Sequence, residues 1–150
     1  MSIEDLKYNS ITKTIIGCAM KVHQKMKNGH LEAVYHKCLL IEFKRADLFV
    51  ESEVEMPIYY EEFIVGRRRV DFLVEKNIIV EIKAVTELTD QHLAQALNYL
   101  ETHNFEVGLL VNFGSKSLQF KRLINQHKLN PTTNQKNPAN PNQNPINPRS

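Results

Sequence analysis

The segment RRRVDFLVEKNIIVEIKAV, residues 67–85, predicts an antiparallel β-hairpin. Val, Ile, Leu and Phe recur through Arg67–Val74 and Ile78–Ala84, and each run has the length of a single strand. Residues 75–77, Glu-Lys-Asn, predict a short turn between the two runs. This hairpin is expected to form the centre of the sheet.

The register of this hairpin brings two acidic residues together. A turn centred on Lys76 aligns Phe72 with Val80, and Asp71 then lies directly opposite Glu81. Facing Cβ atoms in a sheet are about 4.5–5.5 Å apart, and like charges at that distance repel. A positive partner is therefore expected, and a divalent cation is the simplest one. A turn shifted by half a residue leaves a diagonal pairing as the alternative.

The two faces of the hairpin differ in polarity. Because side chains alternate along a strand, Lys83 shares the face of Glu81, and Asp71 and Arg69 add charge at the same end. The opposite face is expected to be apolar through Val70, Phe72, Val74, Ile78, Val80, Ile82 and Ala84. The charged end predicts a cleft that opens away from the turn. The alternative is an ordinary solvated face of an antiparallel sheet.

Composition limits the class of protein. The 150 residues are 42% hydrophobic and 24% charged, as expected for one soluble globular domain. No apolar run reaches the length of a membrane span, and MSIEDLKYNS carries acids where a secretory signal carries bases, so a cytoplasmic location is expected. The net charge of +2 excludes a polycation that binds nucleic acid by bulk charge but leaves a local basic patch open. Cys18 and Cys38 stand apart and predict neither a disulfide nor a zinc site.

Two amphipathic helices are expected before the strands. Apolar residues recur at helical spacing through Ser10–Lys27, with Ser10 as the expected N-cap, and again through Leu31–Ala46. Asn28-Gly29 is expected to separate the two helices. The apolar stripe of the second helix is Leu31, Val34, Tyr35, Cys38, Leu39, Ile41 and Phe43.

The remaining segments complete an α-α-β-β-β-α-β-β order. Alternation through Phe49–Tyr60 predicts a strand, and Pro57 within it indicates an edge or a bulge. The chain then turns through residues 61–62 into the hairpin, which gives three antiparallel strands. After the hairpin come a helix at Asp90–His103, a buried strand at Glu106–Phe113 and an edge strand at Leu118–Ile124. The expected fold class is α/β with a mixed sheet.

The composition changes near the end of the chain. Residues 130–150 contain seven Asn and five Pro but only one large aliphatic residue, Ile146. Such a segment cannot form a hydrophobic core. The sequence therefore predicts one domain over residues 1–128 and a disordered tail over residues 129–150.

Four short motifs occur in a specific order along these elements. They are Gly29-His30-Leu31-Glu32-Ala33-Val34-Tyr35, Val70-Asp71, Glu81-Ile82-Lys83 and Gln95-Ala96-Leu97-Asn98-Tyr99. With them the chain resembles the PD-(D/E)XK nuclease superfamily and, within it, the family named for its GxxExxY motif. The resemblance covers about residues 11–124 and implies a restriction-endonuclease-like core. Val70 stands where the superfamily name has Pro.

The resemblance implies a metal centre. Asp71 and Glu81 would bind Mg²⁺, with Mn²⁺ as a substitute, and the main-chain carbonyl of Ile82 is a further candidate ligand. Glu32 would hold a metal-bound water or a second ion. Lys83 would orient or help to deprotonate the attacking water. The alternative for Glu32 is an acid favoured at a helix start.

The resemblance also implies contacts with the substrate backbone. Gln95 and Tyr99 match the Q-x3-Y pattern of RecB-like nucleases, and His92 precedes them on the same helix. Arg67–Arg69, with Arg69 nearest Asp71, are candidates for phosphate contacts. The alternative for all of these side chains is an exposed face with no ligand.

The expected function is therefore a metal-dependent nuclease, with DNA expected ahead of RNA. The alternative is a catalytically silent module that binds nucleic acid or protein on the same fold. Many enzymes of this kind cut both strands as dimers, so a homodimer is left open.

Overall fold

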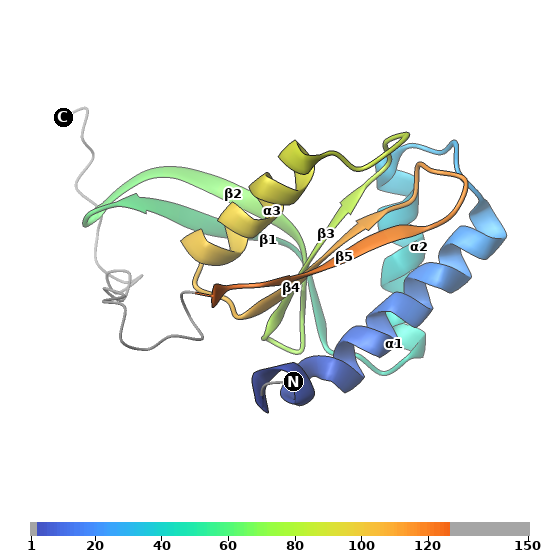
Figure 1. Ribbon diagram of the computed structural model, residues 1–150, viewed down its shortest axis with the longest axis horizontal. Coiled ribbons are helices and arrows are strands. Elements are labelled where there is room, and N and C mark those ends of the chain that lie inside the picture. The colour runs from blue at the N-terminus through green and yellow to red at the C-terminus, as the bar shows by residue number, and fades with distance from the viewer. Residues whose placement is uncertain (1–2, 127–150) are drawn as a thin grey trace.

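The computed structural model describes residues 3–126, with side chains from Tyr8 onward. Figure 1 shows the arrangement of the elements. They are α1 (Ile3–Met26), α2 (Glu32–Arg45), β1 (Val50–Tyr60), β2 (Phe63–Val74), β3 (Ile78–Lys83), α3 (Asp90–Thr102), β4 (Val107–Asn112) and β5 (Gln119–Ile124). The predicted order of elements is confirmed. The predicted end of the domain at residue 128 and the tail at 129–150 lie outside the described residues.

The five strands form one mixed sheet in the order β1-β2-β3-β4-β5. All neighbouring pairs are antiparallel except β3 and β4, which are parallel. A parallel pair needs a long crossover connection, and α3 supplies it here. The predicted three-stranded antiparallel unit is confirmed, and so is the α/β class with a mixed sheet.

Helices cover both faces of the sheet (Figure 1). The larger core lies between α1, α2 and one face, where Ile15, Tyr35, Leu39 and Phe43 are fully buried. From the sheet this core takes Phe72, Val74, Ile78, Val80, Ile82, Val107, Leu109 and Val111. On the other face, the Leu100 side chain of α3 lies so close to Gly108 that a Cβ there would overlap it. The sheet is therefore the middle layer of three.

Val70 does not join the larger core, and this part of the predicted apolar face is wrong. It packs with Leu73 and Ile79 in a second cluster. The alternation of faces along β2 is interrupted between Val70 and Phe72, and Asp71 between them lacks the regular pairing with β1 that both of these residues have. The residue facing Asp71 on β1 is Glu53, whose φ of 54° lies in the left-handed region. Irregular strand positions of this kind re-aim side chains and are common beside active sites.

The predicted start of α1 at Ser10 is also wrong. The helix begins at Ile3. Within it, the carbonyl of Ser10 accepts a hydrogen bond from Oγ1 of Thr14 at 3.1 Å. The residues before Ser10 contain no Gly or Pro, and Glu4 and Asp5 favour a helix start, so nothing ends the helix there.

The apolar stripe predicted for α2 is partly wrong. Tyr35, Leu39 and Phe43 are fully buried, but Leu31 and Ile41 are 78% and 51% exposed. In place of Ile41, α2 buries Glu42. Within residues 3–126 no helix is both long enough and apolar enough to span a membrane.

Candidate functional site

The adjacent acids of β2 and β3 lie where the regular ladder between these strands ends. The predicted register is confirmed, because Val74 pairs with Ile78 and Phe72 pairs with Val80. Beyond Phe72, carboxylate side chains accept the hydrogen bonds of main-chain amides in place of main-chain carbonyls. Oδ2 of Asp71 accepts a hydrogen bond from the Ile82 amide at 2.8 Å, and Oε1 of Glu81 accepts one from the Asp71 amide at 3.4 Å.

This arrangement makes ionisation of Glu81 unfavourable. Burial raises the pKa of Glu81 to about 8, and the charge of Asp71 and a hydrogen bond between the two carboxyl groups act in the same direction. The amide of Asp71 and the positive charge of Lys83 oppose the rise. Glu81 therefore keeps its proton to a higher pH than an exposed glutamate does.

Glu32, in the first turn of α2, lies in the same electrostatic environment. Burial raises its pKa, and the charge of Asp71 raises it further, while Lys83 and His36 lower it. The N-cap residue Leu31 has no side-chain hydrogen bond to the helix end. Asp71, Glu81, Lys83 and Glu32 are thus close enough to influence one another, although α2 and the hairpin are distant in sequence.

The loop between α1 and α2 explains the spacing of Gly29, Glu32 and Tyr35. Gly29 has a φ of 114°, which residues with a Cβ rarely adopt. The buried Tyr35 hydroxyl donates to the carbonyl of Lys27 at 2.5 Å and accepts from the amide of His30 at 3.2 Å. Glycine therefore permits the turn and Tyr35 holds it. Together they fix the point at which α2 starts, and Glu32 stands at that point.

His36 belongs to the site and escaped the sequence analysis. Its Nε2 lies 3.3 Å from the carbonyl oxygen of Asp71 and 3.5 Å from Oγ of Ser52. Its ring stacks on Phe72 with centroids 4.2 Å apart. One signal could have found it: His36 follows Glu32 by four residues, so both side chains lie on one helix face.

Asn112, which the sequence analysis also missed, holds the end of β3 next to Lys83. It is fully buried, and its side chain bonds both the amide and the carbonyl of Val85 at 2.9 Å. The carbonyl of Lys83 accepts from the amide of Phe113 at 2.9 Å. A Cβ on Gly114 would overlap the main chain of Val85, so this close approach requires glycine. An Asn at the end of a buried apolar run was the available signal.

His92 has a structural contact in this fold. Thr89 is the N-cap of α3, and its Oγ1 accepts from the amide of His92 at 3.3 Å. In return, Nδ1 of His92 accepts from the amide of Thr89 at 3.0 Å. The two residues form a capping box. The predicted substrate contact of His92 stays a prediction. Such a contact would use Nε2, because Nδ1 takes part in the capping box.

The other predicted substrate-binding residues lie on α3 and β2. Gln95 and Arg69 are exposed, and Tyr99 is half-buried. The guanidinium of Arg68 lies 3.2 Å from the centroid of the Tyr99 ring, which joins β2 to α3. In the described part of the chain, no hydrogen bond or ion pair joins Gln95, Tyr99 or Arg69 to Asp71.

The carboxylate pair fits a hard divalent cation better than the full predicted set does. Among the described residues, no group of three or more Asp, Glu, His or Cys side chains is arranged to hold a metal ion. Glu32 therefore does not form one cluster with Asp71 and Glu81. The pair itself offers carboxylate oxygens, which Mg²⁺ and Mn²⁺ prefer, and the charge of Asp71 adds to the effect of burial in raising the pKa of Glu81.

Comparison with known proteins identifies a family and a solved structure with a similar fold. A sequence model described as the PD-(D/E)XK nuclease superfamily matches residues 9–123. No curated protein matches the chain. Among solved structures, the crystal structure of SSO0001 is similar, with 22% sequence identity and a TM-score of 0.50. The alignment covers 81% of this chain and 61% of that one, so this chain spans less than two thirds of SSO0001. At this identity the likeness concerns the fold.

Proposed function

Because the chain belongs to the PD-(D/E)XK nuclease superfamily, we propose that it is a metal-dependent nuclease that hydrolyses phosphodiester bonds of DNA. The observation that carries the proposal is the adjacency of Asp71 and Glu81, with Lys83 two residues further along β3. The family match covers residues 9–123 and so includes all three side chains. RNA is the second choice of substrate.

Asp71 and Glu81 are the proposed ligands of Mg²⁺ or Mn²⁺. When bound, the cation would activate a water molecule and offset the negative charge of the phosphate. Asp71 keeps one oxygen on the Ile82 amide, which fixes the orientation of its carboxylate. Glu32 is exposed and interacts electrostatically with Asp71, and it is proposed to hold an ordered water or a second ion. The Ile82 carbonyl remains a proposed further ligand.

Lys83 is proposed to orient the attacking water or to help to deprotonate it. Its positive charge lowers the pKa of both Glu81 and Glu32, so its ammonium group lies near both carboxylates. In that position an ammonium group can donate a hydrogen bond to the water and stabilise charge that builds up on the phosphate. Asn112 is proposed to support this role, since it fixes the main chain directly after Lys83.

Residues of α3 and β2 are proposed to contact the substrate backbone. Gln95 has an exposed amide, and Tyr99 is held by Arg68 at the same helix face. Arg69 is exposed and lies two residues before Asp71 on β2. Contacts of this type position the backbone and do not read base sequence. We also propose a location in the cytoplasm and a homodimer.

Supercoiled plasmid DNA with Mn²⁺ or Mg²⁺ gives the direct test. Wild-type protein is expected to nick the plasmid, and Asp71→Asn, Glu81→Gln and Lys83→Met are each expected to reduce the rate at least a hundredfold. Glu61→Gln is the matched control, because Glu61 is an exposed acid at the turn between β1 and β2. Nicking that survives all three substitutions comes from a contaminant and removes the support for this site.

One observation favours a catalytically silent binding module instead. Within the described residues a third acidic ligand does not join the carboxylate pair. Such a module would bind DNA in a salt-dependent way and would not cleave it with any divalent ion. It would also show no rise in melting temperature on addition of Mn²⁺.

A further inference from the structure

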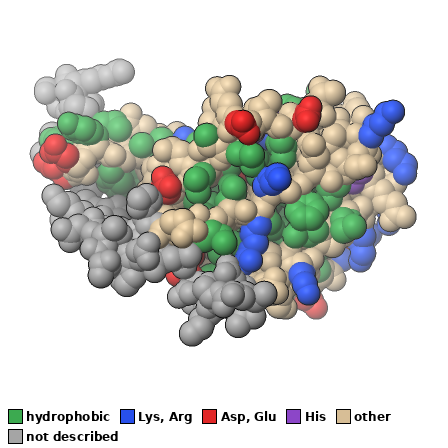
Figure 2. Space-filling view, viewed as in Figure 1, with side chains coloured by type: hydrophobic (Ala, Val, Ile, Leu, Met, Phe, Trp, Pro, Cys, Tyr) green, Lys and Arg blue, Asp and Glu red, His purple; other side chains and the backbone are tan. Residues whose placement is uncertain are grey.

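The layer formed by α1 and α2 is strongly basic, although the whole chain is nearly neutral. Residues 8–46, which cover most of α1 and all of α2, contain seven Lys and Arg residues and only two acids, whereas the complete chain has a net charge of +2. The rest of the chain is correspondingly acidic. Figure 2 shows several Lys and Arg side chains on the right-hand part of the molecule, where α1 and α2 lie, and others near its centre, while Asp and Glu side chains occur both at the left-hand end and along the upper edge.

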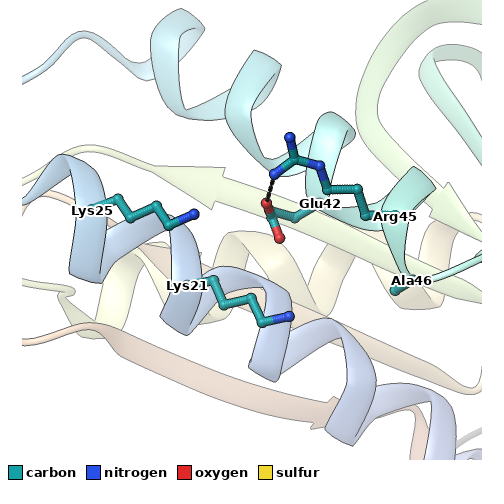
Figure 3. A pocket seen from close by; sticks show the side chains of 5 residues that line it. All are labelled: Lys21, Lys25, Glu42, Arg45 and Ala46. Atoms are coloured by element: carbon teal, nitrogen blue, oxygen red, sulfur yellow. Dashed lines mark hydrogen bonds and ion pairs between the residues drawn. The ribbon is translucent and has the colours of Figure 1, made fainter.

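A pocket of about 310 Å³ lies between α1 and α2 within this basic layer. Lys21 and Lys25 of α1 line one side, and Glu42, Arg45 and Ala46 at the end of α2 line the other. Figure 3 shows the lysine side chains extending from α1 on the side that faces these residues. This volume falls at the small end of the range for ligand sites.

The charges in this pocket are unbalanced. Nη1 of Arg45 lies 2.9 Å from Oε1 of the buried Glu42 (Figure 3). Glu42 is the single acid that lines the pocket, and this ion pair neutralises its charge. Among the described side chains, no carboxylate forms an ion pair with Lys21 or Lys25. These two lysines are four residues apart on one helix face, where like charges repel. An anion placed between the helices would relieve this repulsion.

We propose that the pocket between α1 and α2 binds a phosphate group through Lys21, Lys25 and Arg45. Three cations against one acid leave two excess positive charges, which match a phosphate dianion or two neighbouring phosphodiester groups. The two ammonium groups act as flexible point charges, and the guanidinium supplies donors that Glu42 leaves unused. The buried Glu42 holds Arg45 at the pocket wall.

This pocket is separate from the acidic site of the hairpin. Glu32 is the first residue of α2 and Arg45 the last, so a helix of 14 residues separates them by about 20 Å. The phosphate has two chemical sources: a free phosphate compound, or the backbone of a nucleic acid that extends from the hairpin site. Only the second source rests on the proposed nuclease function.

Titration of the full chain with sodium pyrophosphate tests the proposal without any nuclease activity. Amide chemical shifts of α1 and α2 are expected to change in a saturable way at low salt. The double variant Lys21→Gln/Lys25→Gln is expected to weaken binding at least tenfold. The double variant Lys13→Gln/Lys37→Gln removes the same charge from exposed positions outside the pocket and is expected to change binding less than twofold.

A short DNA oligonucleotide in EDTA separates the two sources, because no cleavage occurs there. A tenfold loss of oligonucleotide affinity in Lys21→Gln/Lys25→Gln, but not in the control, assigns the pocket to the nucleic-acid backbone. Unchanged oligonucleotide affinity with impaired pyrophosphate binding assigns it to a free phosphate compound.

Equal weakening of both ligands by the two double variants overturns the proposal, because it shows only bulk charge. Absence of saturable binding of either ligand overturns it as well. If the protein binds pyrophosphate in this pocket but cleaves neither DNA nor RNA, the proposed nuclease function is disproved and the phosphate site is retained.

Discussion

Asp71 and Glu81 bond to the main chain of each other's strands at the position where the ladder between β2 and β3 stops. Oδ2 of Asp71 accepts a hydrogen bond from the amide of Ile82, the residue after Glu81. Oε1 of Glu81 accepts one from the amide of Asp71. Carboxylate oxygens thus occupy a gap that main-chain carbonyls would otherwise fill. A divalent cation would have to compete only with these two amides, and not with a complete ladder.

The stability of the metal-free protein should depend on the ionisation of Glu81. Its pKa is raised to about 8 in the folded protein from an ordinary value near 4.5. Between these values the folded state keeps a proton that the unfolded state has lost, so the free energy of unfolding should fall as pH rises from about 5 to about 8. Urea unfolding in EDTA at pH 5, 6.5 and 8 measures this, and Glu81→Gln should flatten the profile. A wild-type profile that Glu81→Gln leaves unchanged would show that another group causes the dependence.

Binding of Mn²⁺ should strengthen over the same pH range. The proton on Glu81 must leave before both carboxylates can hold the cation, so metal affinity should rise as pH increases toward 8. At one hundred times its dissociation constant, the ion should stabilise the fold by about 2.7 kcal/mol. Differential scanning calorimetry at pH 6 and pH 8 measures the shift. Asp71→Asn should abolish it, Glu61→Gln should not, and an equal shift in both variants would place the ion elsewhere.

Arg68 and Tyr99 should be energetically coupled. The guanidinium lies over the ring at 3.2 Å and joins β2 to α3, so the pair should contribute about 0.5–2 kcal/mol. A double-mutant cycle of Arg68→Met and Tyr99→Leu, followed by urea unfolding, gives this coupling energy. Arg69→Met is the matched control, since Arg69 is the exposed neighbour on the same strand and should be neutral within about 0.5 kcal/mol. A coupling energy of zero would mean that the contact does not hold α3.

His92 should act through the helix cap. His92→Ala removes the acceptor for the Thr89 amide and should destabilise the protein by about 0.5–1 kcal/mol. His92→Gln restores a side-chain acceptor at the same position of the capping box and should recover most of the loss. Thermal unfolding measures both variants. If DNA affinity fell in His92→Gln while stability was kept, the ring itself would contact the substrate.

The hairpin sequence predicted much of the site because its information is local. A three-residue turn sets the register, and the register sets which side chains face each other, so Asp71 and Glu81 could be paired from residues 67–85. The order of the elements followed from similar short-range patterns. Asn28-Gly29 correctly marked the end of α1, where Gly29 has a positive φ.

The parts that the sequence did not predict depend on distant contacts. His36 contacts the Asp71 carbonyl because α2 packs on the sheet. Asn112, at the end of β4, bonds Val85, which follows the neighbouring strand β3. The interrupted alternation between Val70 and Phe72 lies opposite Glu53 of the neighbouring strand, which has a left-handed main-chain conformation. Ser10 is a good cap by residue type, but the helix before it was not interrupted. In each case a tertiary contact or a competing local preference decided the outcome.

The outermost position of β1 limits how two copies of this protein can associate. Among residues 3–126 no strand pairs with one side of β1, yet β1 carries Pro57, which lacks an amide donor, and the acids Glu51, Glu53 and Glu55. Glu53 also has a left-handed main-chain conformation that breaks the straight run of donors and acceptors. A second molecule therefore cannot extend the sheet along β1 without leaving amide and carbonyl groups unsatisfied, which protects this border against aggregation.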